Sequence, residues 1–106
     1  MAVVTSEWLE GGKVLNIRIE GRFDFSCHQE FRNAYENLGS SNGAKPGTVV
    51  IDLKGTTYLD SSALGMLLLL RDHAGGDNAD VRLINISSDT RKILAISNFD
   101  KLFQIQ

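Results

Sequence analysis

The spacing of hydrophobic and polar residues changes several times along the chain, and each change marks a new element. Residues 14–20 alternate apolar and polar side chains from Leu15 onward, which predicts a strand with one face in solvent. The glycine pair at 11–12 indicates a turn before it, and residues 3–9 form a weaker partner strand of an N-terminal hairpin. Trp8 fits two interpretations here, a strand residue or a plug in the core.

The next segment predicts a helix. Ser26 is a good N-cap for it, after a connection over residues 21–25, and Gly39 is expected to end it. A loop rich in helix breakers should follow over residues 40–47. The apolar positions of this helix recur at helical spacing and are Phe31, Ala34, Tyr35 and Leu38.

The second half of the chain alternates strands and helices. Residues 48–53 are a β-branched run with little alternation, typical of a central strand covered on both faces. Residues 54–59 then read as a connection. A helix over 63–73 is apolar nearly all round, so we expect most of it to be buried. The remaining elements are a strand over 81–84, a helix capped within 87–89 that ends near Asn98, and a short strand over 102–105.

This order, ββαβαβαβ, predicts an α/β fold: one domain over residues 1–106 with a mixed, partly parallel sheet of about five strands and three to four helices. At 106 residues the chain can form one core and leaves little room for a deep substrate cavity. The net charge is −2, and the 11 basic residues form no run or stripe, so we expect no nucleic-acid partner.

Targeting and redox features favour an ordinary cytoplasmic protein. Cys27 is the single cysteine, so no intramolecular disulfide can form. The first residues lack the features of a signal peptide, and the longest apolar run, over 66–70, is too short to cross a membrane. Because no long exposed apolar stripe is evident, we expect a monomer when the protein is free, without membrane insertion.

Candidate chemistry concentrates at one strand-to-helix junction, Asp60-Ser61-Ser62-Ala63-Leu64-Gly65. A helix N-terminus exposes unpaired N–H groups and carries a partial positive charge, so it tolerates an anion such as a phosphate on Ser61. The simpler interpretation is that Asp60 or Ser61 only caps the helix. A hydrolase elbow is a third reading, although the G-x-S-x-G pattern is absent.

Other reactive residues support no enzyme or metal site. His28 and His73 have no metal-ligand spacing with Cys27, and zinc needs three or four convergent ligands. Cys27 fits a small packed side chain better than a nucleophile. Asp24 and Asp60 could act as an acid–base pair only if they lined a pocket, which a chain of this size does not predict. We therefore expect no cofactor, no metal and no enzymatic activity.

The junction and its setting resemble the STAS domain, specifically the anti-sigma factor antagonists. The family pattern is a strand of the type V-V-I-D-L, then D-S-[S/T]-G-hydrophobic-G opening a helix, matched here by residues 49–53 and 60–65. The resemblance implies that Ser61 is the phosphoacceptor and Asp60 its preceding acid. The weaker pattern G-x-x-D over 21–24 implies that Asp24 lies beside the site. Together the implied partner-binding residues are Asp24, Asp60, Ser61, Ser62 and Ala63.

The resemblance also implies a mechanism called partner switching. The unphosphorylated protein would bind an anti-sigma factor or an equivalent regulator, a serine kinase would phosphorylate Ser61 to release it, and a metal-dependent serine phosphatase would reverse the step. Ala63 stands where the family usually has glycine, and its methyl group is expected to affect which kinase can approach. The alternative is a STAS accessory subunit of an ABC-type, lipid-trafficking membrane transport system, which docks on an ATPase and needs no phosphorylation.

Overall fold

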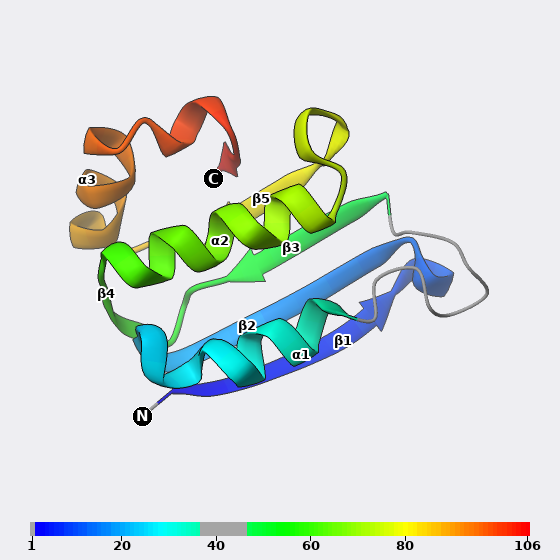
Figure 1. Cartoon of the computed structure of the whole chain (residues 1–106), viewed down its shortest axis with the longest axis horizontal. Coiled ribbons are helices and arrows are strands. Elements are labelled where there is room, and N and C mark those ends of the chain that lie inside the picture. The colour runs from blue at the N-terminus through cyan, green and yellow to red at the C-terminus, as the bar shows by residue number, and fades with distance from the viewer. Residues whose placement is uncertain (1, 37–46) are drawn as a thin grey trace.

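The computed structural model describes residues 2–36 and 47–106, which form a mixed sheet with helices packed across it (Figure 1). Its strands are β1 (Val3–Leu9), β2 (Val14–Phe23), β3 (Thr48–Asp52), β4 (Thr56–Leu59), β5 (Val81–Ile84) and β6 (Gln104–Ile105). The helices are α1 (His28–Glu36), α2 (Ser61–His73) and α3 (Ser88–Ile96). The predicted α/β fold with a mixed sheet is confirmed.

The sheet has the order β1-β2-β3-β5-β6, and β4 pairs with β2 off this path. β1 runs antiparallel to β2, while the pairs β2–β3, β3–β5 and β5–β6 are parallel. The N-terminal hairpin and the central place of β3 are thus as predicted. The second face of β3 is covered only in part, because Val50 is half-buried while Val49 and Ile51 are fully buried.

The core lies between the sheet and the helices that cross it. Alternate residues of β2 (Leu15, Ile17 and Ile19) are buried, and the intervening Arg18 and Glu20 lie on the opposite, exposed face. α1 and α2 run across the buried face (Figure 1). Helix residues that complete the core include Phe31, Tyr35, Met66, Leu67, Leu70 and Leu94.

β4 is a strand that sequence analysis missed, since residues 54–59 were expected to be a connection. β2 also continues through Phe23 instead of ending at residue 20, and its last part pairs in parallel with β4. The register shifts between Gly21 and Arg22, and Gly21 has a φ of 99°, which a glycine adopts without steric cost. This kink turns the end of β2 away from β3 and towards β4.

Other predictions need local corrections. Asp24, not Ser26, caps the 3₁₀ turn η2 (Phe25–Cys27) that leads into α1. Trp8 is 41% exposed and so is no core plug. α2 is less buried than predicted, because Leu68 and Leu69 are 40% and 63% exposed. The predicted helix residue Leu38, the stop at Gly39 and, except for Gly47, the predicted loop over 40–47 lie outside the described residues.

Candidate functional site

Asp60 organises the start of α2. It is the N-cap residue, with extended backbone, and its Oδ1 accepts hydrogen bonds from the Ala63 N–H at 3.1 Å and from the Ser62 hydroxyl at 2.6 Å. The Asp60 carbonyl accepts from the Leu64 N–H at 3.2 Å. A negative side chain here also complements the positive end of the helix dipole. Ser61 and Ser62 are therefore the first two residues of the helix proper, held in fixed positions.

The two adjacent serines differ in availability. Ser62 is half-buried, and its hydroxyl is engaged by Asp60. Ser61 is exposed, and within residues 2–36 and 47–106 no hydrogen bond of its hydroxyl is found. An enzyme that modifies a hydroxyl must reach it and orient it. The geometry therefore offers Ser61, and not Ser62, to such an enzyme.

Asp24 and Asp60 come together because their strands are neighbours. Phe23, the last residue of β2, pairs with Leu59, the last residue of β4, so each aspartate begins the chain segment that leaves an adjacent strand. Parallel neighbours lie about 4.8 Å apart, which places the two aspartates side by side at this end of the sheet. The sequence-predicted association of Asp24 with the Asp60–Ser61 junction thus has a structural basis in the β2–β4 pair.

Local contacts keep Asp24 ionised. The Ser26 hydroxyl donates to its Oδ1 at 2.5 Å, the Ser26 backbone N–H donates to the same atom at 2.9 Å, and the Arg22 guanidinium lies 3.5 Å from Oδ2. These contacts, the Ser26 hydroxyl first, hold the pKa of the Asp24 carboxyl below its ordinary value. Arg22 also stacks over the Tyr58 ring at 4.1 Å from the centroid, so its charge is shared between two neighbours.

Ala63 occupies a different environment from the one predicted. Its side chain is fully buried, with an exposed fraction of 0%. The methyl group therefore packs in the core beneath α2 and is not on the surface, so any effect of Ala63 on which kinase can approach would be indirect and stays a prediction. The backbone N–H of Ala63 still contributes, because it is the group that Asp60 caps.

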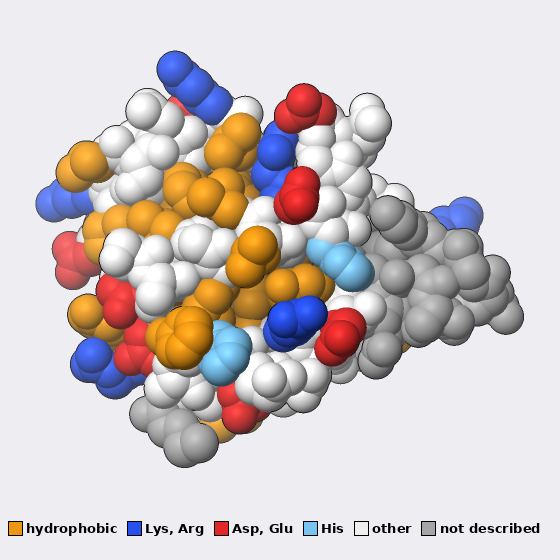
Figure 2. All heavy atoms as spheres, in the orientation of Figure 1, with side chains coloured by type: hydrophobic (Ala, Val, Ile, Leu, Met, Phe, Trp, Pro, Cys, Tyr) orange, Lys and Arg blue, Asp and Glu red, His pale blue; other side chains and the backbone are white. Residues whose placement is uncertain are grey.

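Apolar side chains near the junction are exposed, a feature that sequence analysis did not anticipate. Phe25 is 62% exposed and stacks on His28 with ring centroids 4.2 Å apart. Along α2, Gly65 and Leu68 lie one and two turns from Ser61 on the same exposed face. Figure 2 shows hydrophobic side chains gathered over α2, with charged side chains around them. Because α2 is apolar nearly all round, its sequence did not indicate which face would be exposed.

A hydrolase would need a base hydrogen-bonded to the Ser61 hydroxyl, and no such bond to a histidine occurs in residues 2–36 and 47–106. The Nδ1 of His28 lies 3.1 Å from the Phe25 carbonyl, and His73 packs on Tyr35 at the other end of α2, twelve residues or about 18 Å from Ser61. In the described part of the chain, no group of three or more His, Cys, Asp or Glu side chains is placed to hold a metal ion. Burial raises the pKa of the Cys27 thiol, which disfavours the reactive thiolate.

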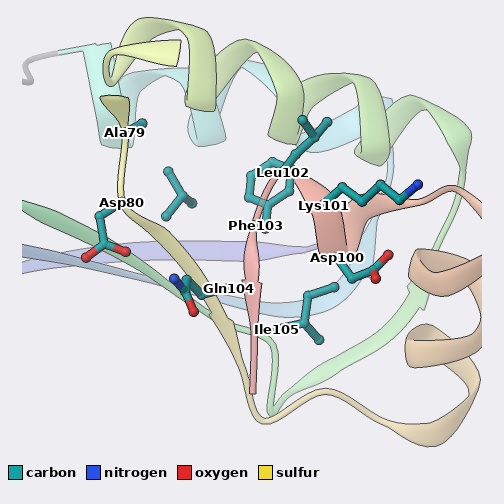
Figure 3. Close-up of a pocket in the computed structure, with 9 residues that line it drawn as sticks. Ala79, Asp80, Asp100, Lys101, Leu102, Phe103, Gln104 and Ile105 are labelled. Carbon is teal, nitrogen blue, oxygen red and sulfur yellow. The ribbon is translucent and has the colours of Figure 1, made fainter. Parts of the chain in front are cut away.

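A hollow of about 510 Å³ lies elsewhere, beside β5 and β6 (Figure 3). Asp80, on its wall, is already paired with Arg82 at 3.1 Å and accepts from the Thr48 hydroxyl at 2.9 Å. The hollow includes none of the predicted site residues. It is lined by Ala79, Asp80, Val81, Asp100, Lys101, Leu102, Phe103, Gln104 and Ile105.

Within residues 2–36 and 47–106, the helices lack the length and apolar character that crossing a membrane requires.

Comparison with known proteins places this geometry in a family. A family model described as "Mlab, STAS domain" matches residues 10–104. A STAS-domain containing protein of Pseudomonas aeruginosa (strain UCBPP-PA14) is 61% identical over 94 residues, which cover 89% of each chain.

Solved structures of anti-sigma factor antagonists have a similar fold. The antagonist SpoIIAA in its unphosphorylated form has a TM-score of 0.73 at 17% identity, covering 98% of this chain and 87% of that one. Phosphorylated SpoIIAA, from Bacillus, has a TM-score of 0.72 at 17% identity, with coverages of 98% and 91%. An antagonist from Mycobacterium paratuberculosis has a TM-score of 0.73 at 19% identity, with coverages of 99% and 85%.

Proposed function

Because this chain belongs to the STAS domain family, we propose that it is an anti-sigma factor antagonist whose binding of a partner protein is controlled by phosphorylation of Ser61. The unphosphorylated form binds an anti-sigma factor or an equivalent regulator, and this binding releases a sigma factor and so regulates transcription. The likeness of fold to SpoIIAA, solved in both unphosphorylated and phosphorylated forms, supports the proposal.

One observation carries the proposal: the contrast between Ser61 and Ser62. Both hydroxyls stand at the start of α2, yet only that of Ser61 is exposed and free of the Asp60 carboxylate. Without that contrast, the junction would be a helix cap and nothing more. With it, the junction presents one accessible hydroxyl on a rigid helix start.

The surroundings of Ser61 explain how a phosphate would act. Ala63 and Leu64 donate their N–H groups to Asp60, which leaves the N–H groups of Ser61 and Ser62 at the open end of the helix, where an anion is favoured. The fold would therefore tolerate the phosphate. The phosphate adds nearly two negative charges beside Asp60 and Asp24, which a partner with acidic or close-packed groups must then meet.

A modest cost at this interface is enough for a switch. A loss of about 3 kcal/mol in binding free energy weakens the complex roughly a hundredfold. The exposed apolar residues Phe25, Leu68 and Leu69 would supply the contact area that the unphosphorylated protein offers to its partner. Asp24, Asp60, Ser61 and Ser62 are the polar residues of this proposed docking surface.

The chain itself has no catalytic task in this proposal. A serine kinase, which can be the anti-sigma factor itself, supplies ATP and Mg²⁺, and a metal-dependent serine phosphatase removes the phosphate. This chain contributes an accessible hydroxyl and a stable helix start. The protein would act in the cytoplasm, where its partners act on the transcription machinery.

The first test is intact-mass analysis of the protein isolated from its native cells. Phosphorylation adds about 80 Da, and peptide mapping should place the adduct on Ser61. The Ser61→Ala variant should lose the adduct, while Ser62→Ala, the matched control one residue away, should keep it. An adduct that persists in Ser61→Ala and disappears in Ser62→Ala would contradict the assignment.

A binding experiment then tests the switch. Ser61→Ala should retain the protein partner captured by the wild type, and Ser61→Asp should lose it at least tenfold while its circular dichroism spectrum and melting temperature stay close to those of the wild type. Equal retention by both variants would reject the switch. It would instead favour a transport subunit that docks on an ATPase without phosphorylation.

A further inference from the structure

β1 is an outer strand of the sheet, and no strand of residues 2–36 and 47–106 pairs with its far edge (Figure 1). Its seven residues pair with β2 without a register shift. Edge strands of stable monomers are usually blunted by charged side chains, above all lysine, or by proline, bulges, shortness or a covering helix or loop. β1, Val-Val-Thr-Ser-Glu-Trp-Leu, has seven residues, no lysine, no proline and no bulge, and Glu7 is its single charged residue. We propose that β1 pairs with β1 of a second copy of this chain to form a two-fold symmetric dimer.

The sequence of β1 is complementary to itself in one register. Antiparallel pairing about a two-fold axis at Ser6 places Val3 opposite Leu9, Val4 opposite Trp8 and Thr5 opposite Glu7 of the other copy. Val3, Trp8 and Leu9 are 60%, 41% and 38% exposed in the single chain, and each would gain an apolar neighbour. All seven residues of the strand are used in this register.

The charges select the same register. Within one chain, Thr5 pairs with Arg18 of β2, and both lie on the open face of the sheet. Glu7 of the other copy would lie opposite Thr5, in the same row as the half-exposed Arg18. Shifting the axis to Glu7 would place two glutamates opposite each other, and shifting it to Thr5 would place Glu7 opposite Val3. Both shifts are less favourable.

Part of the helix-covered face of β1 is exposed in the single chain. Val4, Ser6 and Trp8 lie on the same face as the buried β2 residues Ile19, Ile17 and Leu15, with which they pair. α1 packs against β1, but Ser6 and Trp8 remain exposed on this face. Because both copies use the same edge, the pairing closes on itself and leaves no β1 edge for a third copy.

This proposal differs from the monomer expected from the sequence. That expectation considered apolar stripes, whereas an open edge depends on which strand the topology places outermost. The dimer does not depend on phosphorylation of Ser61, since that residue lies at the start of α2 and not on β1.

Sedimentation of the purified chain tests the dimer. The wild type should shift with concentration from 11.7 kDa, the mass of one chain, towards twice that mass. Ser6→Lys places two like charges opposite each other on the axis and should raise the dissociation constant at least tenfold. Ser97→Lys, which makes the same charge change at an exposed position after α3, should leave it unchanged.

Crosslinking gives an independent measurement if Ser6→Lys disturbs the strand. Ser6→Cys should form a covalent dimer under mild oxidation, because the two residues at the axis face each other; Ser97→Cys should not. The native Cys27 is buried and does not compete. A wild type that stays monomeric up to about 1 mM, or equal crosslinking by both cysteine variants, would overturn the proposal.

Discussion

A single carboxylate connects stability and function at the residue scale. Oδ1 of Asp60 accepts from both the Ala63 N–H and the Ser62 hydroxyl. The same interactions start α2 and withdraw Ser62 from modification. Ser61, one residue earlier in the helix, is left as the accessible hydroxyl because it is exposed and Asp60 engages Ser62 and Ala63 instead.

Substitution of Asp60 separates these two effects. Asp60→Ala removes the cap and should lower the free energy of unfolding by about 1–2 kcal/mol. Asp60→Asn keeps an equally good capping oxygen, so its free energy of unfolding should fall by less than half as much. That smaller loss reflects the missing negative charge at the helix N-terminus. Urea unfolding of both variants measures the difference. Equal destabilisation would mean that the charge, and not the hydrogen bond, is what Asp60 contributes.

The sequence indicated the residues of the candidate site, whose role stays a prediction, but it did not indicate their environments. The motif identified Asp60 and Ser61 because it encodes a helix start, which is local in sequence. Burial of Ala63 depends on how α2 packs on the sheet, which no local pattern specifies. The role of Asp24 as the cap of η2, in place of Ser26, depends on the extension of β2 to Phe23.

At the scale of elements, α2 is a helix with two apolar faces. One face packs in the core through Met66, Leu67 and Leu70, and the other exposes Leu68 and Leu69. The sequence predicted the helix from its strong helix formers but could not distinguish a buried apolar face from an exposed one. β4 was missed for another reason: it has four residues and pairs with the distant end of β2, not with its neighbour in sequence, β3.

Gly65 offers a test of the exposed face of α2. A Cβ added there meets no atom within 4 Å, so the fold itself has no need for glycine at this position. Gly65→Ala should raise the free energy of unfolding by about 0.5–1 kcal/mol, because alanine is the better helix former. If partners pack closely against this face, as proposed, the same substitution should weaken binding of the captured partner at least threefold.

The combination of higher stability and weaker binding is what distinguishes this result. Ala95→Gly, at an exposed position inside α3, is the opposite change and should lower stability by a similar amount. Comparable binding by Gly65→Ala and the wild type would show that the partner does not contact α2 at this turn. If Ala95→Gly also bound the partner more weakly, the weaker binding of Gly65→Ala would be explained by altered stability and not by a contact at Gly65.

At the scale of the whole molecule, we expect the free energy of unfolding to fall at acid pH, because the folded structure lowers the pKa of Asp52. Asp52, at the end of β3, accepts from the Asn85 side chain and from the Lys54 N–H, each at 3.0 Å, and Arg18 lies 3.6 Å away. Burial raises the pKa of the Asp52 carboxyl, but these hydrogen bonds and charges outweigh burial and hold it below its ordinary value of 3.8. In its ionised form Asp52 therefore connects the end of β3 to the middle of β2, through Arg18, and to the residue after β5, Asn85.

The direction of the pH effect follows from this lowered pKa. In the unfolded chain the Asp52 carboxyl binds a proton near pH 3.8, and in the folded chain it does so only at lower pH. The stabilisation is therefore complete above about pH 5 and is lost as the pH falls through the folded pKa. Asp52→Asn should lower the free energy of unfolding at pH 7 by about 1–3 kcal/mol. Between about pH 5 and pH 2, the free energy of unfolding of this variant should decrease less than that of the wild type. Asp72→Asn, which removes an exposed carboxylate of α2, is the control; if both variants flatten the acid profile equally, the buried junction of the three strands is not its source.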